Sequence, residues 1–496
     1  MITITRKAMS LILTFAMLFA MVQATGVTAY AASSDYDRDS GDRDSHQTML
    51  FAVSSSDDDR TVLYVDSGDI TINGDTGGYV ITQKDSEKQT SHTITVTEGI
   101  HNITLRGVNI NSSGSPFSIQ AGATVYLTLE NENRLIGGMN YAGLEVQAGT
   151  ADKSDASLII TDKSSGSLEA KGGDYSAGIG GNLGRRNGDI TISGGTVTAN
   201  GVYGAGIGSG FYGFGGEITI SGGTVTATGV YGAGIGGGAA GSGGEITISG
   251  GTVTATGIAG GAGIGGGDHG NGGTIEISGG TVTANSDYYG IPDCGAGIGG
   301  GNNGDGGTIT ISGGTVTANS DYGAGIGGGN NGDGGRITIS GGTVTTTSDY
   351  GAGIGDGFDC GLRDSTITIT GSGTKVTAKG YNDIGSGKYY SAGGSLTVGE
   401  DNVTDGPTVE LQNSGTNANQ KKFVNCNILG TGAKSMNIMG HYNKDGDRLP
   451  IEITLPTASA IASNSNLSVS QLSGGEVLDN DKTIEGTFSW KYGTPL

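Results

Sequence analysis

A column of tyrosines is the feature of this 496-residue sequence that is best suited to ligand chemistry. Each tyrosine stands just before a short AGIG segment or its equivalent. Tyrosine combines an apolar ring face with a hydroxyl, so it can stack on sugar rings, which expose C–H groups on their faces and hydroxyls at their edges. The same column is also consistent with a ring ladder that only stabilises a corner of the fold. The tyrosines are Tyr175, Tyr203, Tyr231, Tyr322, Tyr350 and Tyr381.

The tyrosine column is interrupted at Gly260 and Gly261, and the next repeat carries the only sizeable insertion, from Tyr288 to Cys294. A loop beside a gap in a flat ladder forms a concavity, and concave surfaces bind small ligands more readily than flat ones. Tyr288 and Tyr289 therefore join the candidate ligand-binding residues. The alternative is an insertion without function.

Acidic residues form a second column that could hold a cation. Like charges stacked on neighbouring strands repel, and a hard cation with oxygen ligands between them would relieve the repulsion. Calcium is therefore the expected cofactor, although an Asn-Asp-Gly turn is usually only a turn, and the tandem nonapeptides of calcium β-rolls are missing. The candidate metal ligands are Asp189, Glu217, Glu245, Glu276, Asp305 and Asp333. The last two belong to turn loops of successive repeats, and these loops also contain Asp268, Asn271, Asn302, Asn303, Asn330 and Asn331.

Two further sequence patterns give weaker indications of function. The T-V-T segments would place a flat threonine array on the surface, which resembles the face of certain ice-binding proteins, but threonine is also the ordinary solvent-facing residue of a strand. The GAGIGG segments match a dinucleotide fingerprint formally. That fingerprint requires a single copy that opens a helix, whereas here the segment recurs in repeat after repeat, so we discard it.

No catalytic motif accompanies these columns. The five histidines lie in unrelated positions, and neither G-x-S-x-G nor H-E-x-x-H occurs. Threonines stand where a polysaccharide lyase or hydrolase would need carboxylates and arginine. The sequence therefore predicts a protein that is not an enzyme.

The elements that must position these columns are short strands. The motif ITISGGTVTA recurs at intervals of 28 to 34 residues, a period typical of solenoids. Each repeat offers three runs of period two, ITI, TVTA and AGIG, and period two indicates strands rather than helices. Glycines separate the runs, because sharp corners need positive φ.

The predicted fold is an all-β, right-handed parallel β-helix of roughly twelve three-strand coils over residues 61–440. In one coil the residues expected to point inward are Ile218, Ile220, Val225, Ala227 and Ile235. Stacked coils place equivalent side chains about 4.8 Å apart. Each column is therefore a line of side chains along the solenoid.

Composition restricts the cellular context. Residues 1–31 match a secretory signal peptide, with Arg6 and Lys7, an apolar run and a cleavage site after Ala31. Residues 32–60 read as a disordered acidic lead-in. No later segment is long and apolar enough to span a membrane, and three widely spaced cysteines do not indicate a disulfide framework. A net charge of −22 argues against nucleic acid as a partner.

The repeat unit ITISGGTVTATG-YGAGIGGG, together with the signal peptide, resembles a family of secreted Gram-positive β-helix surface proteins identified as carbohydrate-binding. The resemblance covers about residues 61–430, and at least one member type of that family is a non-catalytic, calcium-using pectin binder. Residues 450–496, with PTAS, LSGG and GTFSW, resemble the first half of a small all-β module of Gram-positive surface proteins. The resemblance assigns no ligand residues.

These observations together predict a secreted, cell-surface-associated protein that binds an extracellular polysaccharide. An acidic polysaccharide would need calcium to bridge it to so acidic a protein. The alternatives are an adhesin or stalk without a sugar ligand, and a polysaccharide lyase or hydrolase. The sequence leaves the oligomeric state open.

Overall fold

The described part of the chain is a stack of β-coils. The computed structural model describes residues 60–412, except 75, 288–289, 291–292, 361–364, 389–394 and 400–405, together with short strands between 426 and 483. The predicted signal peptide, nearly all of the acidic lead-in, and the candidates Tyr288 and Tyr289 lie outside the described residues. Of the module predicted for 450–496, only strand positions are described, without side chains.

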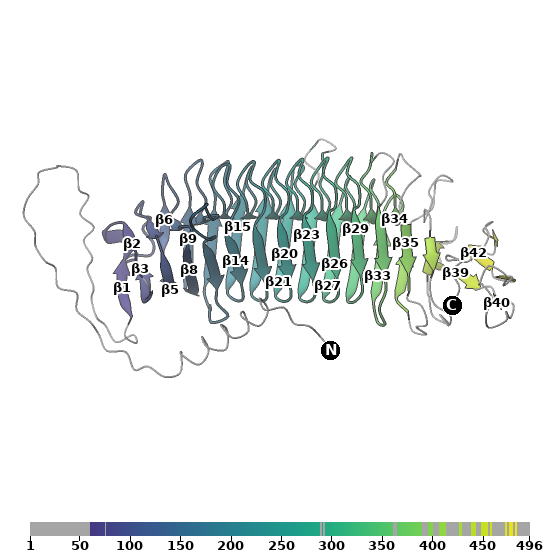
Figure 1. Cartoon of the computed structure of the whole chain (residues 1–496), viewed down its shortest axis with the longest axis horizontal. Helices are drawn as coiled ribbons and strands as arrows, with labels where there is room; N and C mark the ends of the chain where they lie inside the picture. Colours follow the sequence, from purple (N-terminus) through teal and green to yellow (C-terminus); the bar gives the residue numbers. More distant parts are fainter. Residues whose placement is uncertain are drawn as a thin grey trace, which may run out of the picture. The chain divides into compact units, whose positions relative to one another are not determined.

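Three parallel sheets run along the stack, and each complete coil contributes one strand to each sheet (Figure 1). This arrangement confirms the predicted right-handed parallel β-helix. Sheet A contains β1 (Thr61–Tyr64), β3 (Thr76–Thr82), β5 (Gly99–Arg106), β8 (Ala123–Glu130), β11 (Ser157–Ile160), β14 (Asp189–Ile192), β17 (Glu217–Ile220), β20 (Glu245–Ile248), β23 (Thr274–Ile277), β26 (Thr308–Ile311), β29 (Arg336–Ile339), β32 (Thr366–Ile369), β35 (Ser395–Val398) and β37 (Cys426–Ile428).

Sheet B is built from very short strands, most of them the Ile-Gly pair of the AGIG segments. Its 12 strands agree with the roughly twelve predicted coils. They are β2 (Ile70–Ile72), β4 (Ile94–Val96), β7 (Phe117–Ile119), β10 (Leu144–Val146), β13 (Ile179–Gly180), β16 (Ile207–Gly208), β19 (Ile235–Gly236), β22 (Ile264–Gly265), β25 (Ile298–Gly299), β28 (Ile326–Gly327), β31 (Ile354–Gly355) and β34 (Ile384–Gly385).

Sheet C contains the TVTA strands and continues into antiparallel strands at the C-terminal end. Its parallel strands are β6 (Asn109–Asn111), β9 (Glu132–Ile136), β12 (Ser167–Lys171), β15 (Thr196–Gly201), β18 (Thr224–Gly229), β21 (Thr252–Gly257), β24 (Thr281–Ser286), β27 (Thr315–Ser320), β30 (Thr343–Ser348), β33 (Lys375–Lys379) and β36 (Thr408–Leu411). The C-terminal strands are β38 (Ile438–Tyr442), β39 (Arg448–Thr454), β42 (Glu476–Asp479) and β43 (Lys482–Thr483), and β40 (Thr457–Ala458) pairs separately with β41 (Leu472–Ser473).

The core is a set of aliphatic ladders inside the coils. All five residues predicted to point inward in one coil are completely buried. Ile218 pairs in register with Ile190 and Ile246, and Val225 pairs with Val197 and Val253. Because each inward side chain packs on its copy in the next coil, a repeat that could not bury its own apolar side is stabilised by its neighbours.

Two loops in each repeat lie side by side. The tyrosine loop joins sheet C to sheet B, and the glycine loop joins sheet B to sheet A. The Ala239 amide of one glycine loop donates to the Tyr203 carbonyl of a tyrosine loop at 2.8 Å, and Asp268 makes the same bond to Tyr231. In Figure 1 the loops of successive coils project from one edge of the stack.

Helices contribute almost nothing to the described residues, where η1 (Val65–Ser67) is a single 3-10 turn and no α-helix occurs. Within this same part of the chain, no helix has the length and hydropathy needed to cross a membrane.

Candidate functional site

The predicted tyrosine ladder exists as two stacks. Tyr175, Tyr203 and Tyr231 stack with ring centroids 5.3 and 4.7 Å apart, and Tyr322 stacks on Tyr350 at 4.5 Å. All five stand four residues before the isoleucine of a sheet B strand. The repeat therefore positions them on one line of the solenoid surface, since the sheet B strands pair in register.

The gap between the two stacks has a steric cause in the first of its two coils. Gly260 and Cys294 hold the tyrosine position in the two intervening coils. A Cβ on Gly260 would lie only 2.8 Å from the Cγ of Asp268, so the Asp268 side chain occupies space that a tyrosine would need. The first stack thus ends next to a carboxylate.

A second aromatic wall comes from one glycine loop. Phe211 lies 5.3 Å from Tyr203 and 5.9 Å from Tyr175, centroid to centroid, and it also contacts Tyr212 at 3.9 Å. In the next two coils the position of Phe211 is held by Ala239 and then by Asp268. The step from phenylalanine to alanine opens space directly beside the ring of Tyr203.

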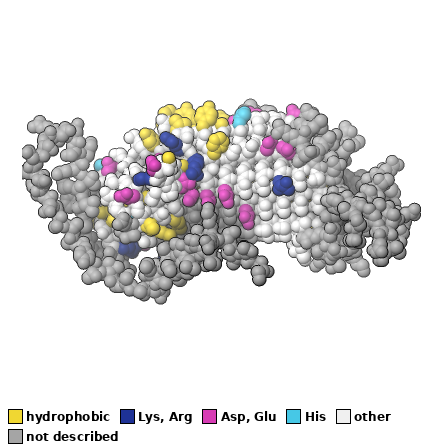
Figure 2. Space-filling model, in the orientation of Figure 1, with side chains coloured by type: hydrophobic (Ala, Val, Ile, Leu, Met, Phe, Trp, Pro, Cys, Tyr) yellow, Lys and Arg dark blue, Asp and Glu magenta, His cyan; other side chains and the backbone are white. Residues whose placement is uncertain are grey.

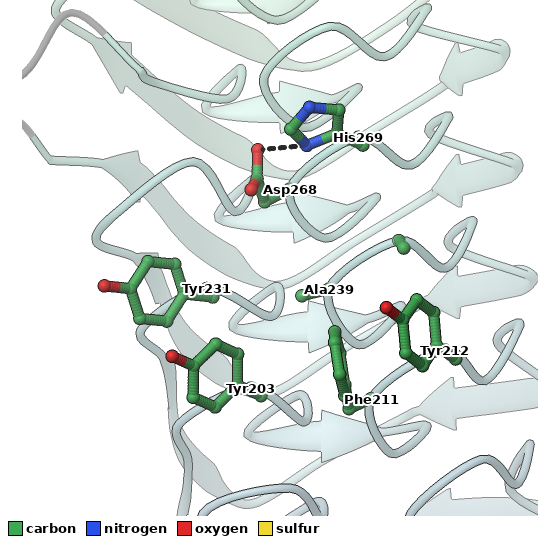
Figure 3. A pocket seen from close by; sticks show the side chains of 8 residues that line it. Tyr203, Phe211, Tyr212, Tyr231, Ala239, Asp268 and His269 are labelled. Carbon is green, nitrogen blue, oxygen red and sulfur yellow. Dashed lines mark ion pairs between the residues drawn. The ribbon is translucent and has the colours of Figure 1, made fainter.

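This space is a hollow of about 310 Å³. Figure 3 shows Tyr203 and Tyr231 along one side, Phe211 and Tyr212 around one end, and Asp268 and His269 at the other end, with Ala239 between them. The lining is completed by Ala240. We call this feature the aromatic hollow; its walls are ring faces and its floor is the buried Ala239.

The polar end of the aromatic hollow is an aspartate with two hydrogen-bonding neighbours. Asp268 Oδ1 lies 2.9 Å from His269 Nδ1 and accepts a hydrogen bond from Asn302 Nδ2 at 3.1 Å. Burial raises the pKa of Asp268 above its ordinary value, while Asn302 and His269 oppose the rise. The carboxylate is thus held in place and faces a largely apolar space.

Backbone strain is present at the rim. Tyr212 has φ +61° and its side chain is largely exposed. The equivalent positions in neighbouring coils are also left-handed, namely Gly184, Ala240 and His269. A bulky residue in this conformation costs about 1 kcal/mol, so Tyr212 is a poor choice for stability alone.

Tyr212→Gly is therefore expected to raise the free energy of unfolding by about 1 kcal/mol, because glycine adopts positive φ without steric cost. Urea unfolding followed by circular dichroism measures the change. Phe214→Gly, at an exposed neighbour without positive φ, is the control and should give no gain. A loss of stability in Tyr212→Gly would show that the ring supports the fold.

The acidic column lies at the start of sheet A strands, away from the lining of the aromatic hollow. Glu217 pairs directly with Glu245, and Glu276 pairs with Thr247, one outward position further along. Burial raises the pKa of Asp189, and the charges of Asp155 and Glu217 add to the rise. Figure 2 shows the largest group of hydrophobic side chains at the upper edge of the visible face and a row of acidic side chains across its middle.

The turn carboxylates serve as hydrogen-bond acceptors along the stack. Asp305 Oδ1 accepts from the Asp333 amide at 3.0 Å, and Asp333 Oδ1 accepts from the Ser365 hydroxyl at 2.7 Å. Among the residues that the structure describes, no three His, Cys, Asp or Glu side chains converge on a point where they could hold a metal ion. Calcium stays a prediction.

Sequence reasoning missed Phe211, Ala239 and the role of Asp268 with His269. Phe211 and Phe358 are the two aromatic residues at one fixed position, four residues after a sheet B isoleucine, and that regularity was visible in the repeats. The contact between the two loops was not visible, because nothing in the spacing says that the glycine loop folds against the tyrosine loop.

Comparisons with known proteins agree with the fold. A family described as the beta helix repeat matches residues 190–211, 218–239, 246–268, 275–302, 309–330 and 337–358. No curated protein and no solved structure matches the chain. The chain therefore carries beta helix repeats, a fold shared by polysaccharide-binding proteins, polysaccharide-degrading proteins and adhesins.

Proposed function

We propose that this chain is a secreted, non-catalytic protein that binds a polysaccharide along its tyrosine-loop edge, with the aromatic hollow as the main subsite. The observation that carries the proposal is the pairing of the stacked rings Tyr203 and Tyr231 with Phe211 across an alanine floor. Ring faces on both sides suit the C–H faces of a sugar, and Asp268 offers an acceptor to its hydroxyls.

The ladder extends the site beyond one sugar ring. Tyr175, Tyr203 and Tyr231 present rings at about the repeat of the coils, so successive sugars of one chain can use successive tyrosines. Each contact alone is weak, but contacts made by one chain raise the effective concentration for the next. Affinity should therefore grow with the length of the oligosaccharide.

The lining also supports binding over hydrolysis. A glycoside hydrolase ordinarily needs two carboxyl groups that flank the scissile bond. Among the residues that line the aromatic hollow, Asp268 is the single acid. We therefore keep the lyase or hydrolase alternative behind binding.

Replacing Tyr231 by alanine is expected to weaken polysaccharide binding about tenfold, because it removes one wall of the aromatic hollow and ends the ladder early. A glycan array of neutral, acidic and amino polysaccharides, followed by calorimetry on the best ligand, measures the effect. Tyr126→Ala is the matched control, since Tyr126 is an exposed tyrosine of β8 outside the aromatic hollow. Equal binding by both variants and the unchanged protein would contradict the proposal.

Calcium enters this proposal only at the acidic column. An acidic polysaccharide bridged by calcium at Glu217 and Glu245 would lose its binding in a chelator, whereas binding at the aromatic hollow should not change. The array is therefore run with calcium and with chelator. If no glycan binds in either condition, the adhesin or stalk alternative takes precedence.

A further inference from the structure

The aromatic arrangement of the hollow occurs twice in the chain. Tyr175, Tyr203 and Phe211 are repeated as Tyr322, Tyr350 and Phe358, each 147 residues later. In both copies two stacked tyrosines meet the phenylalanine, at 5.3 to 5.9 Å in the first and 5.5 to 5.7 Å in the second. The phenylalanine amide donates to the carbonyl of the first tyrosine at 2.9 Å and 3.0 Å.

The two copies differ in the next coil. Ala239 follows Phe211 at the position four residues after a sheet B isoleucine, and Lys388 follows Phe358 at the same position. The Lys388 ammonium lies 5.2 Å from the ring centre of Tyr350, and 5.8 Å from those of Phe358 and Tyr381. The second copy thus places a cation among its three rings.

We infer that the aromatic hollow of the first copy takes a protonated amine on its ligand, so that the bound polysaccharide is one that contains amino sugars. This inference rests on the proposed function and names its ligand class. The ligand's ammonium would lie beside Tyr203, Phe211 and Tyr231, where Lys388 lies in the second copy relative to Tyr350, Phe358 and Tyr381. Aromatic faces attract cations through their quadrupoles, more strongly where water is excluded.

Charge around the aromatic hollow favours the same ligand. The polar end is the Asp268 carboxylate, and no lysine or arginine is among the lining residues. The nearby Asp293 carboxylate adds negative charge, which is one of the influences that raise the pKa of Asp268. A cationic polysaccharide also suits a chain of net charge −22 without any bridging metal.

A sugar amine fits the surroundings better than a lysine side chain of a protein partner. The hollow continues into the ladder of Tyr203 and Tyr175, whose rings can stack on the sugars next to the amine-bearing one. A lysine side chain would use the hollow and leave the ladder without a ligand. The test separates these two sources of the amine.

The first experiment compares ligands on the full chain by calorimetry. The probes are a glucosamine hexamer, its fully N-acetylated counterpart, a galacturonate hexamer and a hexalysine peptide. The glucosamine hexamer should bind at least tenfold more tightly than its acetylated counterpart, because acetylation removes the charge and leaves the sugar ring. The galacturonate and hexalysine should bind more weakly still.

The second experiment compares variants. Asp268→Asn keeps the shape of the polar end, removes its charge and should weaken the glucosamine hexamer about tenfold. It should weaken the acetylated hexamer less, because that sugar brings no positive charge to the carboxylate. Ala239→Lys copies Lys388 and should place an ammonium in the hollow, so it should abolish binding of the glucosamine hexamer. Ala239→Gln adds similar bulk without charge and should retain measurably more binding than Ala239→Lys.

The outcomes are distinct. Equal affinity for the two glucosamine forms, or equal losses of binding in Ala239→Lys and Ala239→Gln, would overturn the inference. The proposed polysaccharide binding would still stand if Tyr231→Ala weakens it. Hexalysine binding without glycan binding would overturn both the inference and the proposed function. The ligand comparison uses the unchanged protein, so it decides the inference even if a variant does not fold.

Discussion

Gly236→Ala is expected to destabilise the solenoid by more than about 3 kcal/mol, a large effect for a single methyl group. Gly236 closes β19 with φ +131°, a backbone conformation that residues with a side chain rarely adopt. A Cβ there would lie 2.1 Å from the Gly265 carbonyl oxygen of the next coil. That oxygen accepts the Gly237 amide, so it cannot move aside without breaking the contact between coils.

The matched control is Gly184→Ala. Gly184 also has positive φ, +71°, but a Cβ at this position would meet no atom within 4 Å. It should cost about 1 kcal/mol, the price of the backbone conformation alone. Urea unfolding of both variants isolates the clash as their difference. If the two variants lose the same stability, close stacking of coils is not what requires glycine at position 236.

This contrast explains why so much glycine is compatible with a fold. Gly251 turns the SGG corner with φ +79°, and a Cβ there would also approach the backbone of the preceding coil within 3 Å. The sequence pattern predicted positive φ at these corners correctly. It did not show the second requirement, that the coils stack closely enough at the corners to exclude a side chain.

The fold was predictable because the same pattern of inward and outward residues recurs in many repeats. One coil with Ile218, Ile220 and Val225 is weak evidence, but register-matched copies such as Ile246, Ile248 and Val253 leave one consistent set of inward faces. The same repetition predicted that the tyrosines would lie in line. Whether side chains form a column depends only on their position within the repeat, and that position can be read directly from the sequence.

The aromatic hollow was less predictable because it depends on departures from the repeat. Ala239 stands where the preceding coil has Phe211, Gly260 replaces a tyrosine, and Asp268 uses the space that Gly260 leaves. Each change is unremarkable in sequence, and together they form a site only because the two loops hydrogen-bond to each other. The sequence indicated a concavity one coil further on, at the insertion that contains Tyr288 and Tyr289, which lies outside the described residues.

A buried carboxyl near the C-terminal end of the described coils carries the second large expectation. Asp356 is 2% exposed and follows β31 directly. The Ser365 hydroxyl contacts both Asp356 Oδ1 and Asp333 Oδ1. One hydroxyl has one proton to donate, so the second of these contacts needs a proton on a carboxyl group. The Gly334 amide, 2.8 Å from Asp356 Oδ1, adds a hydrogen bond from the neighbouring coil.

Burial raises the pKa of Asp356 to about 7, with the charge of Asp333 as a smaller contribution, while the hydrogen bonds from Ser365 and Gly334 oppose the rise. The ordinary value, which we take for the unfolded chain, is 3.8. The folded protein therefore binds this proton more tightly than the unfolded chain does. The protonated Asp356 therefore contributes stability that is fully present below pH 3.8. This contribution is lost as the pH rises toward 7, where the buried carboxyl group must ionise.

The free energy of unfolding of the unchanged protein should therefore fall by on the order of 3 kcal/mol between pH 5 and pH 8 because of Asp356. Asp356→Asn should not show this decrease, because asparagine does not ionise. The difference in unfolding free energy between the two proteins, measured in urea across that range, cancels the titration of all other groups. Because a solenoid can open coil by coil, hydrogen exchange at β31 and β32 supplies the local measurement. In the unchanged protein, exchange at these strands should rise with pH more steeply than the intrinsic exchange rate does. In the variant it should follow the intrinsic rate. If the unfolding free energy and the exchange rates of the two proteins change with pH in the same way, the expectation is wrong. Asp356 would then be already ionised in its buried site, stabilised by Ser365 and the Gly334 amide against the cost of burial.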